Sequence, residues 1–473
     1  MNKKILFFLI ILFLGFTQVQ IGQDIVGKNI GDLSGDALSI SSDGNIIAIG
    51  SQLNSDNGHY SGHVRVFENI LGVWTQLGQD LNGANIVDRF GYNISLSADG
   101  NTIAIGSPGN GSLGSVSGHV QVFENVSGVW IQQGQNIQGD VNEFSQGGQS
   151  GSSVSLSADG TIVAISSPTL NKPFGSNLGY VKIFQFISGN WIQMGNEIIA
   201  EEAGDENGIC ISISASGSIV AIGANKNDGN GVDSGHVRVF EYISGGWTQI
   251  GQDIDGKMTG DFSGTVVSLS ADGSVVAIGA PSALASNLDQ VRVFKNIAGV
   301  WTQIGNDIAG GITGKISIAL SGDGDTLIVS SNGVYRSKLY RNVSGSWVEI
   351  TTIGTIGNFF SVALSSDGTT AAISSPHSSS NRGITTLYDI SNLSNNVFVS
   401  QNFNIYPNPT SDVLNLSLEN NLVLEQVTIY NNLGQVVKTA TENVIDVSQF
   451  AKGLYFVEVT TNQGKATKKM IVR

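Results

Sequence analysis

Short segments in which apolar and polar residues alternate recur along most of the chain, and glycine-containing turns separate them. A representative stretch is SLSADGNTIAIGSP, from Ser95 to Pro108, in which an Asp-Gly step separates two such segments. Alternation with a period of two is typical of β-strands that bury one face. The pattern therefore predicts short strands joined by tight turns, and hence an all-β fold.

The same unit occurs seven times along the chain. Its serine-rich or alanine-rich strand begins at Ser39, Ser95, Ser155, Ser212, Ser268, Ala319 and Ala363. A strand of the type GHVRVFEN, or a looser form of it, follows in each copy, and the first six copies add a strand with a tryptophan. The tryptophans are Trp74, Trp130, Trp191, Trp247, Trp301 and Trp347. Four short strands repeated at this spacing predict a seven-bladed β-propeller.

The seventh copy ends at Ile390 without a tryptophan strand, so its blade lacks an outer strand. The segment QVQIGQDIVG, from Gln18 to Gly27, matches WTQLGQDLNG, from Trp74 to Gly83, in register. We expect this N-terminal segment to complete the last blade, because an open ring would expose unpaired strand edges. Residues 18–390 would then form one closed propeller domain.

The repeat resembles the FG-GAP family in its short secreted bacterial form. In that family Phe-Gly opens the first strand and Gly-Ala-Pro follows the second. Here Phe90-Gly91 precedes NISLSADG, and Gly279-Ala280-Pro281 closes SVVAIGAP. The resemblance covers most of the seven copies and implies a propeller fold. It implies little about function, because propellers host many activities.

The N-terminus, MNKKILFFLIILFLGFTQ, places Lys3 and Lys4 before an apolar run from Ile5 to Phe16. A run of this length is shorter than the roughly 20 residues that a membrane-spanning helix needs. Small or polar residues follow it, as they do at signal-peptide cleavage sites. Residues 1–17 are therefore predicted to be a secretory signal peptide that is cleaved after Thr17. No transmembrane segment is then expected in the mature chain.

A polar stretch, residues 391–401, is interpreted as a linker to a C-terminal unit of a different pattern. Residues 402–473 alternate with glycine-containing turns, which predicts a small Ig-like β-sandwich. This unit resembles the type A sorting domain of the type IX secretion system of Bacteroidota. Its matching residues are Tyr406, Pro407, Asn408, Pro409, Leu433, Gly434, Gln435, Asp446, Gly453, Tyr455, Lys468 and Lys469.

The resemblance of the C-terminal unit implies a route of export and a partner. The signal peptide would carry the chain into the periplasm, and the type IX machinery would recognise the tail and move the chain across the outer membrane. Removal of the tail would be followed by release or by attachment to surface lipopolysaccharide. The expected location is extracellular or at the outer cell surface.

Charge and cysteine content narrow the choice of partners. The formal net charge is -15, and an acidic chain is a poor partner for nucleic acid or an anionic membrane, which favour clustered Lys and Arg. The single cysteine, Cys210, cannot form a disulfide within the chain. Its place in the alternation GICISIS predicts a small buried hydrophobic residue.

Repeated acidic residues raise the question of calcium binding. They are Asp43, Asp99, Asp159, Asp272, Asp323 and Asp367. One Asp before one Gly offers few of the six to eight oxygens that calcium takes, so we interpret these steps as two-residue hairpin turns with positive φ at both positions. The loop NKNDGNGVDSG, with Asn227, Asp228, Asn230 and Asp233, is the calcium candidate that stays open. No other cofactor or metal site is indicated.

Three further sets of residues recur with the repeat, and recurrence favours a structural role. His63, His119 and His236 share one position, and Arg65, Arg238 and Arg292 share another. We interpret the arginines as strand-surface residues. The tryptophans are expected to pack over the neighbouring blade and not to form a sugar-binding surface.

We find no catalytic arrangement in the sequence and predict that the protein is not an enzyme. The main hypothesis is a non-catalytic binding or adhesion module for a glycan or a protein, which acts through the loops that differ between copies. These loops are Gln52–Tyr60, Glu143–Ser150, Pro168–Asn177 and Asn225–Ser234. The alternatives are a polysaccharide lyase or glycosidase, with acids, His or Arg converging on one end of the channel, and a purely architectural surface component.

Overall fold

The computed structural model describes most of the chain as strands. The described residues are 19–111, 116–140, 148–169, 178–281, 290–309, 316–331, 337–354, 361–391, 399, 403–419, 422–461 and 464–473. Within them, helix is limited to the four-residue turn α1, Ser378–Asn381, and to Val399. The prediction of an all-β protein is confirmed. The predicted signal peptide and nearly all of the predicted linker lie outside the described residues.

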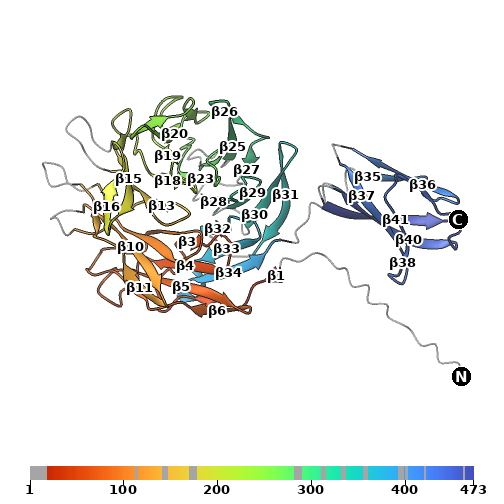
Figure 1. Ribbon diagram of the computed structural model, residues 1–473, viewed down its shortest axis with the longest axis horizontal. Coiled ribbons are helices and arrows are strands. Elements are labelled where there is room, and N and C mark those ends of the chain that lie inside the picture. The colour runs from red at the N-terminus through yellow and green to blue at the C-terminus, as the bar shows by residue number, and fades with distance from the viewer. Residues whose placement is uncertain are drawn as a thin grey trace, which may run out of the picture.

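Strands from residues 19–389 form seven antiparallel sheets around a common axis (Figure 1). The first sheet contains β3 (Ala37–Ile40), β4 (Ile46–Ser51), β5 (His63–Ile70), β6 (Val73–Gln76) and β7 (Leu81–Asn82). The second contains β8 (Asn93–Leu96), β9 (Thr102–Ser107), β10 (His119–Val126), β11 (Val129–Gln132) and β12 (Ile137–Gln138). The third contains β13 (Val154–Leu156), β14 (Ile162–Ser167), β15 (Tyr180–Ile187), β16 (Asn190–Gln193) and β17 (Ile198–Ile199). Below we number these sheets as blades in chain order.

The remaining four blades follow the same order. The fourth contains β18 (Cys210–Ile213), β19 (Ile219–Ala224), β20 (His236–Ile243), β21 (Gly246–Gln249) and β22 (Ile254–Asp255), and the fifth contains β23 (Val266–Leu269), β24 (Val275–Ala280), β25 (Gln290–Ile297), β26 (Val300–Gln303) and β27 (Ile308–Ala309). The sixth contains β28 (Ile316–Leu320), β29 (Thr326–Ser331), β30 (Ser337–Val343) and β31 (Ser346–Ile353). The seventh contains β32 (Ser361–Leu364), β33 (Thr370–Ser375) and β34 (Ile384–Asp389). The innermost strand of each blade contacts those of both neighbours, and β32 contacts β3, so the ring is closed.

The N-terminal strands β1 (Val19–Gln20) and β2 (Ile25–Val26) belong to the seventh blade. Val19 lies opposite Asp389, and Ile25 lies opposite Thr385, so both strands pair with β34. They occupy the places that β6 and β7 take in the first blade. The two ends of the repeat region therefore meet in one sheet.

The outer edge of most blades differs from the single fourth strand that we expected. In the first blade β6 and β7 both pair with β5 and are separated by Gly78, which has a φ of 75°. A Cβ at Gly78 would lie 2.7 Å from the ring of Trp130 in the next blade. The outer strand is therefore broken where the neighbouring tryptophan packs against it.

Apolar side chains fill the space between adjacent blades and form the core. Val64 and Val66 of the first blade, for example, pack with Ile103 and Ile105 of the second. The tryptophans lie in the same interfaces, and the indole of Trp130 donates a hydrogen bond to the carbonyl of Leu77 at 2.8 Å. This supports the expected packing of the tryptophans over the neighbouring blade.

Serines of the innermost strands connect most blades to the next. The amide N–H of Leu96 donates to the hydroxyl of Ser39 at 2.8 Å, and that of Leu156 donates to Ser95 at 2.9 Å. Ser212 takes this role in the fourth blade, and two residues before it the sulfur of Cys210 accepts from the N–H of Val267 at 3.4 Å. Cys210 is half-buried, and desolvation of its sulfur raises the pKa of the thiol. Cys210 is therefore not the plain hydrophobic residue that we expected.

The C-terminal residues form two sheets with a shared core. One contains β35 (Phe403–Tyr406), β36 (Val413–Leu418) and β39 (Val444–Asp446), and the other contains β37 (Leu424–Asn431), β38 (Val436–Ala440), β40 (Gly453–Thr461) and β41 (Gly464–Val472). Phe403 and Leu414 of the first sheet pack with Val427 and Val457 of the second. This unit has its own hydrophobic core.

Candidate functional site

The antiparallel order of the strands gives the propeller two ends of different character. The Asp-Gly turns, such as the one between β3 and β4, lie at one end, which we call the turn end. The connections from the second to the third strand of each blade, such as Gln52–Tyr60 and Asn225–Ser234, lie at the opposite end, which we call the loop end. The other two variable loops, Glu143–Ser150 and Pro168–Asn177, lie largely outside the described residues.

The turn end is built from short, nearly identical turns that bond to one another. The N–H of Ser42 donates to the carbonyl of Ala98, and the same contact recurs from blade to blade until Asp367 donates to Ser42. These turns surround a cavity of about 190 Å³ on the axis. Its described lining consists of Ala, Gly, Ser, Leu and Ile, which supplies no acid, base or metal ligand at this end.

The Asp-Gly turns are four-residue turns, so the expected two-residue type with positive φ at both positions is wrong. Gly44 has a φ of 74°, whereas Asp43 is not among the residues with positive φ. The hydroxyl of Ser41 donates to Oδ1 of Asp43 at 2.7 Å, and the N–H of Asn45 donates to the same oxygen at 3.0 Å. Two local donors therefore fix the carboxylate and hold Asp43 away from the left-handed region.

These turn carboxylates predict a loss of stability in acid. Partial burial alone would raise their pKa, but the hydrogen bonds outweigh burial and hold the pKa of Asp43, Asp99, Asp159 and Asp272 below its usual range. Their contribution is thus complete above about pH 4 and is lost as the pH falls through the lower folded values. Denaturant unfolding at pH 7 and pH 3 should show this loss, and replacing all four by Asn should flatten the profile. An unchanged profile in that variant would contradict the assignment.

The loop end carries exposed apolar side chains from several blades. Ile30, Ile86 and Val232 are 69%, 68% and 62% exposed. Each loop lies against the segment that leads into the next blade, as the hydrogen bonds Val87 N–H to His59 O and Gly260 N–H to Val232 O show. Short apolar patches therefore recur around this end.

The calcium candidate loop is organised by its own hydrogen bonds. Oδ1 of Asn227 accepts from the N–H of Gly229 at 2.9 Å, and its amide group donates to Asp205 at 3.2 Å. Oδ1 of Asp228 accepts from the N–H of Asp233 at 2.8 Å, and the amide group of Asn230 donates to the carbonyl of Gly256 at 2.9 Å. Two of the oxygens that calcium would need thus already accept hydrogen bonds, and calcium binding at this loop stays a prediction.

The arginines at the shared repeat position are not strand-surface residues, contrary to our expectation. Arg238 and Arg292 are only 6% and 7% exposed. Their guanidinium groups donate to the carbonyls of Ile199 and Asp255 at 2.8 and 2.7 Å, and Arg65 donates to Val26 O at 2.8 Å. Each acceptor is in the short outer strand of the preceding blade, so these arginines connect neighbouring blades.

The three repeated histidines are buried at the start of the third strand of their blades, and burial lowers the pKa of each. Their surroundings differ. His119 contacts the amide of Gln121 at 3.2 Å, whereas His63 lies near Asp80, whose carboxylate binds the ammonium of Lys28 at 3.0 Å. Both ring nitrogens of His63 and Nδ1 of His119 have no hydrogen-bond partner among the described residues, and the structural role of these two histidines stays a prediction.

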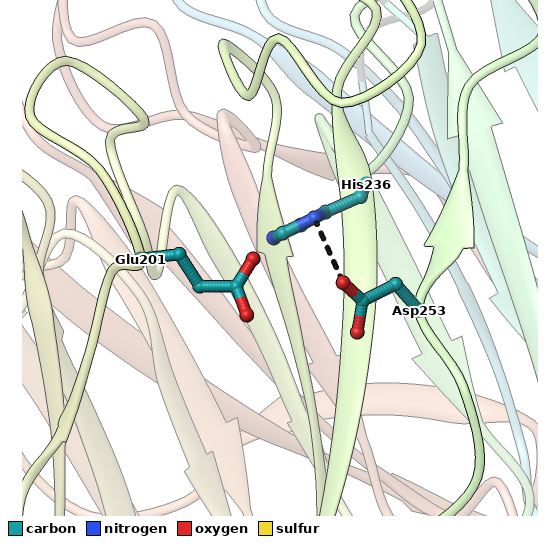
Figure 2. A group of neighbouring side chains, drawn as sticks. All are labelled: Glu201, His236 and Asp253. Atoms are coloured by element: carbon teal, nitrogen blue, oxygen red, sulfur yellow. Dashed lines mark ion pairs between the residues drawn. The ribbon is translucent and has the colours of Figure 1, made fainter.

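His236 has a different setting, which sequence reasoning missed. Glu201 and Asp253 approach its imidazole from two sides (Figure 2). Nδ1 of His236 lies 3.9 Å from Oδ2 of Asp253, and one potential ligand atom from each of the three residues falls within 4.8 Å of the others. Glu201 follows the third blade, while His236 and Asp253 belong to the fourth, so the cluster lies at a contact between two blades. Among the described residues, it is the only such group of His, Cys and acidic side chains.

In the C-terminal unit, the predicted motif residues fall into a structural and an exposed set. The amide of Asn408 donates to the carbonyl of Lys469 at 2.7 Å and accepts from the N–H of Ile471 at 2.9 Å, so the YPNP segment is fixed to β41. The hydroxyl of Tyr455 donates to Ala451 O at 2.8 Å. Leu433, in the turn between β37 and β38, is 78% exposed.

The other predicted motif residues lie in the turns and strands of the same unit. Lys468 contacts the carbonyl of Phe403 and the side chain of Asn404, whereas Lys469 is exposed. Asp446 ends β39 and accepts from the N–H of Ser448 at 2.9 Å. The remaining members are Tyr406, Pro407, Pro409, Gly434, Gln435 and Gly453.

Comparison with protein families gives a match to the C-terminal unit. The family described as the secretion system C-terminal sorting domain matches residues 404–473. This segment is a sorting domain. The sorting domain implies handling by the type IX secretion machinery and export out of the cell, to the surface or the extracellular space.

A curated relative shares a short stretch with this chain. Beta-agarase D of Zobellia galactanivorans is 35% identical over 75 residues, which is 15% of this chain and 15% of that protein. The match is thus comparable in length to the sorting domain and leaves most of that relative unmatched. The agarase activity belongs to that protein as a whole.

Solved structures similar to this chain are propeller-like. A chain of the Mitotic Checkpoint Complex has a TM-score of 0.50 and 13% identity, and the match covers 78% of this chain and 95% of that one. Hydrazine synthase of Kuenenia stuttgartiensis has a TM-score of 0.49 and 13% identity, over 76% of this chain and 96% of that one. At such identities the likeness concerns the fold alone.

A search of the described residues for a helix long and apolar enough to cross a membrane finds none.

Proposed function

We propose that the exported chain is a seven-bladed propeller that binds a glycan or a protein at its loop end without catalysing a reaction. The sorting domain, an Ig-like sandwich in this proposal, delivers the propeller to the cell surface or the surroundings by way of the periplasm. Binding there would serve adhesion or the capture of nutrients.

The observation that carries this proposal is the contrast between the two ends of the propeller. The turn end is uniform, and its cavity is lined by serine, glycine and aliphatic residues. The loop end bears the segments that vary between copies, together with the exposed apolar side chains of Ile30, Ile86 and Val232. A surface of variable loops on a rigid scaffold is where proteins usually place their binding residues.

A binding assay with surface variants tests the proposal. The exported protein, fluorescently labelled, is applied to a glycan array and to intact bacterial cells, with and without calcium. We expect selective binding to one of them, and Ile86→Asp should weaken it about tenfold, the usual effect of losing one central apolar contact. Leu71→Asp is the matched control, since Leu71 is fully exposed in the turn between β5 and β6 at the opposite end.

Two outcomes would overturn the proposed function. Absence of binding in both arms would favour a purely architectural role. Equal loss of binding in the Leu71→Asp and Ile86→Asp variants would place the ligand elsewhere than at the loop end.

A further inference from the structure

We propose that Glu201, His236 and Asp253 bind a divalent transition cation of the zinc class at the contact between the third and fourth blades. Two carboxylates and one imidazole form a ligand set that zinc accepts, with a fourth position left for water. The same set suits calcium poorly, because calcium takes six to eight oxygens.

The spacing of the three side chains fits an ion after a small movement. Ligand atoms about 2.1 Å from a tetrahedral ion lie roughly 3.4 Å apart. Here they lie within 4.8 Å of one another, and His236 Nδ1 is 3.9 Å from Asp253 Oδ2. The side chain of Glu201 is 45% exposed, so it can rotate toward the other two.

The imidazole is the observation that points to a ligand. His236 is 1% exposed, and Nε2 has no hydrogen-bond partner among the described residues. A buried polar atom without a partner costs free energy, which coordination through Nε2 would recover. The 3.9 Å separation from Asp253 is that of Nδ1, so the side chains must also rotate for Nε2 to share an ion with both carboxylates. Burial also lowers the pKa of His236, so the ring is neutral near pH 7, the form that binds metals.

In two other interfaces a lysine holds the position of Glu201, whereas Asp140 holds it at the contact of the second and third blades and pairs with Lys182. Lys28 follows Gly27 in the seventh blade and binds Asp80 of the first, and Lys257 follows Gly256 in the fourth blade and binds Asp307 of the fifth. Glu201 occupies the corresponding place after the third blade, and Asp253 corresponds to Asp80 and Asp307.

The consequence is a local excess of negative charge. The other two interfaces hold a lysine ammonium against a carboxylate in addition to the arginine of the next blade. This interface holds two carboxylates and a neutral imidazole with the guanidinium of Arg238 alone. A bound divalent cation would supply the positive charge that lysine supplies elsewhere, and it would join the two blades in the same way.

Arg238 is the one cation that the structure places beside the cluster. Its Nη1 lies 3.3 Å from Oε1 of Glu201, while its Nη2 donates to Ile199 O and to the side chain of Asn207. This ion pair involves Oε1, which is one of the two carboxylate oxygens of Glu201. Oδ1 of Asp253 accepts from Gln249 at 2.6 Å, which leaves Oδ2 facing the imidazole.

Titration calorimetry and thermal unfolding of the exported protein with Zn²⁺ test the site. We expect one Zn²⁺ per chain and a melting temperature about 4 °C higher at a hundredfold excess over the dissociation constant than in the presence of a chelator. The variants Glu201→Lys and His236→Gln should each weaken binding at least tenfold, since even outer-shell changes at metal sites cost about that much.

Both variants copy residues that the repeat already tolerates. Lysine stands at this position in two other interfaces, and Gln290 stands at the histidine position of the fifth blade. Glu201→Lys should therefore keep or raise the melting temperature of the metal-free protein while removing its response to Zn²⁺. His63→Gln, in the first blade, is the matched control and should bind Zn²⁺ normally.

The absence of Zn²⁺ binding would overturn the proposal. So would Zn²⁺ binding that survives in both Glu201→Lys and His236→Gln, or binding that His63→Gln removes. None of these results bears on ligand binding at the loop end, so the two proposals can fail separately.

Discussion

Removal of residues 18–27 should lower the melting temperature of the propeller by about 10 °C. The deletion exposes the edge of β34, which pairs with β1 and β2. It also removes hydrogen bonds to the first blade, including Trp74 Nε1 to Ile21 O at 2.8 Å and Arg65 to Val26 O at 2.8 Å. Seven hydrogen bonds outside the strand ladder are lost. At about 1 kcal/mol each they cost about 7 kcal/mol, and a domain of this size loses about 1.3 °C per kcal/mol.

The deletion can be checked by differential scanning calorimetry with a rescue control. The synthetic peptide QVQIGQDIVG, added in excess, should raise the melting temperature of the shortened chain in a concentration-dependent way, because it binds only the folded ring. A scrambled peptide of the same composition should have no effect. An unchanged melting temperature after the deletion would show that ring closure does not depend on this segment.

The strand pattern and the repeat were readable from the sequence because they depend on local rules. Alternation predicts strands wherever one face is buried, and the Asp-Gly steps mark turns whatever their exact type. The register match between Gln18–Gly27 and Trp74–Gly83 predicts that the N-terminal segment pairs with the third strand of the last blade. The structure confirms this, since Val19 lies opposite Asp389 of β34. These features need no knowledge of how one blade sits on another.

The features that sequence reasoning missed all depend on contacts between blades. The break at Gly78 follows from the ring of Trp130 in the next blade, and the burial of Arg238 follows from a carbonyl at Ile199 in the preceding one. A repeat position alone does not reveal what the neighbouring copy places against it. The turn type was also missed, because the hydroxyl of Ser41 competes for the carboxylate of Asp43.

The polar cluster of Figure 2 had a signal in the sequence that the alignment of copies did not use. Its members are far apart in the chain and belong to two blades, so no short motif contains them. The signal is an acidic residue, Asp140 or Glu201, at the repeat position of Lys28 and Lys257. Of these two, Glu201 alone precedes a blade that keeps the repeated histidine, since Tyr180 takes that position in the third blade. A departure from the repeat at a position that binds a neighbouring blade is more informative than the recurring histidines themselves.

Deletion of residues 402–473 should hold the chain in the periplasm of a bacterium that has the type IX secretion system. The sorting domain has its own core, with Phe403, Leu414, Val427 and Val457 in contact, so its loss leaves the packing within the propeller unchanged. We expect immunoblots of cell fractions to show that the surface and medium fractions fall from most of the protein to almost none. Export of the shortened chain at the normal level would contradict this role of the tail.

A point variant separates recognition of the sorting domain from its folding. Leu433 is 78% exposed in a motif turn, so Leu433→Asp removes an apolar surface without opening the core. We expect this variant to fold normally, by circular dichroism and protease resistance, and yet to be exported several-fold less. Val444→Asp is the matched control, because Val444 is 57% exposed but lies outside the predicted motif residues. Normal export of both variants would show that the type IX machinery does not recognise the exposed turn. The motif at Leu433 would then act only by supporting the fold of the domain.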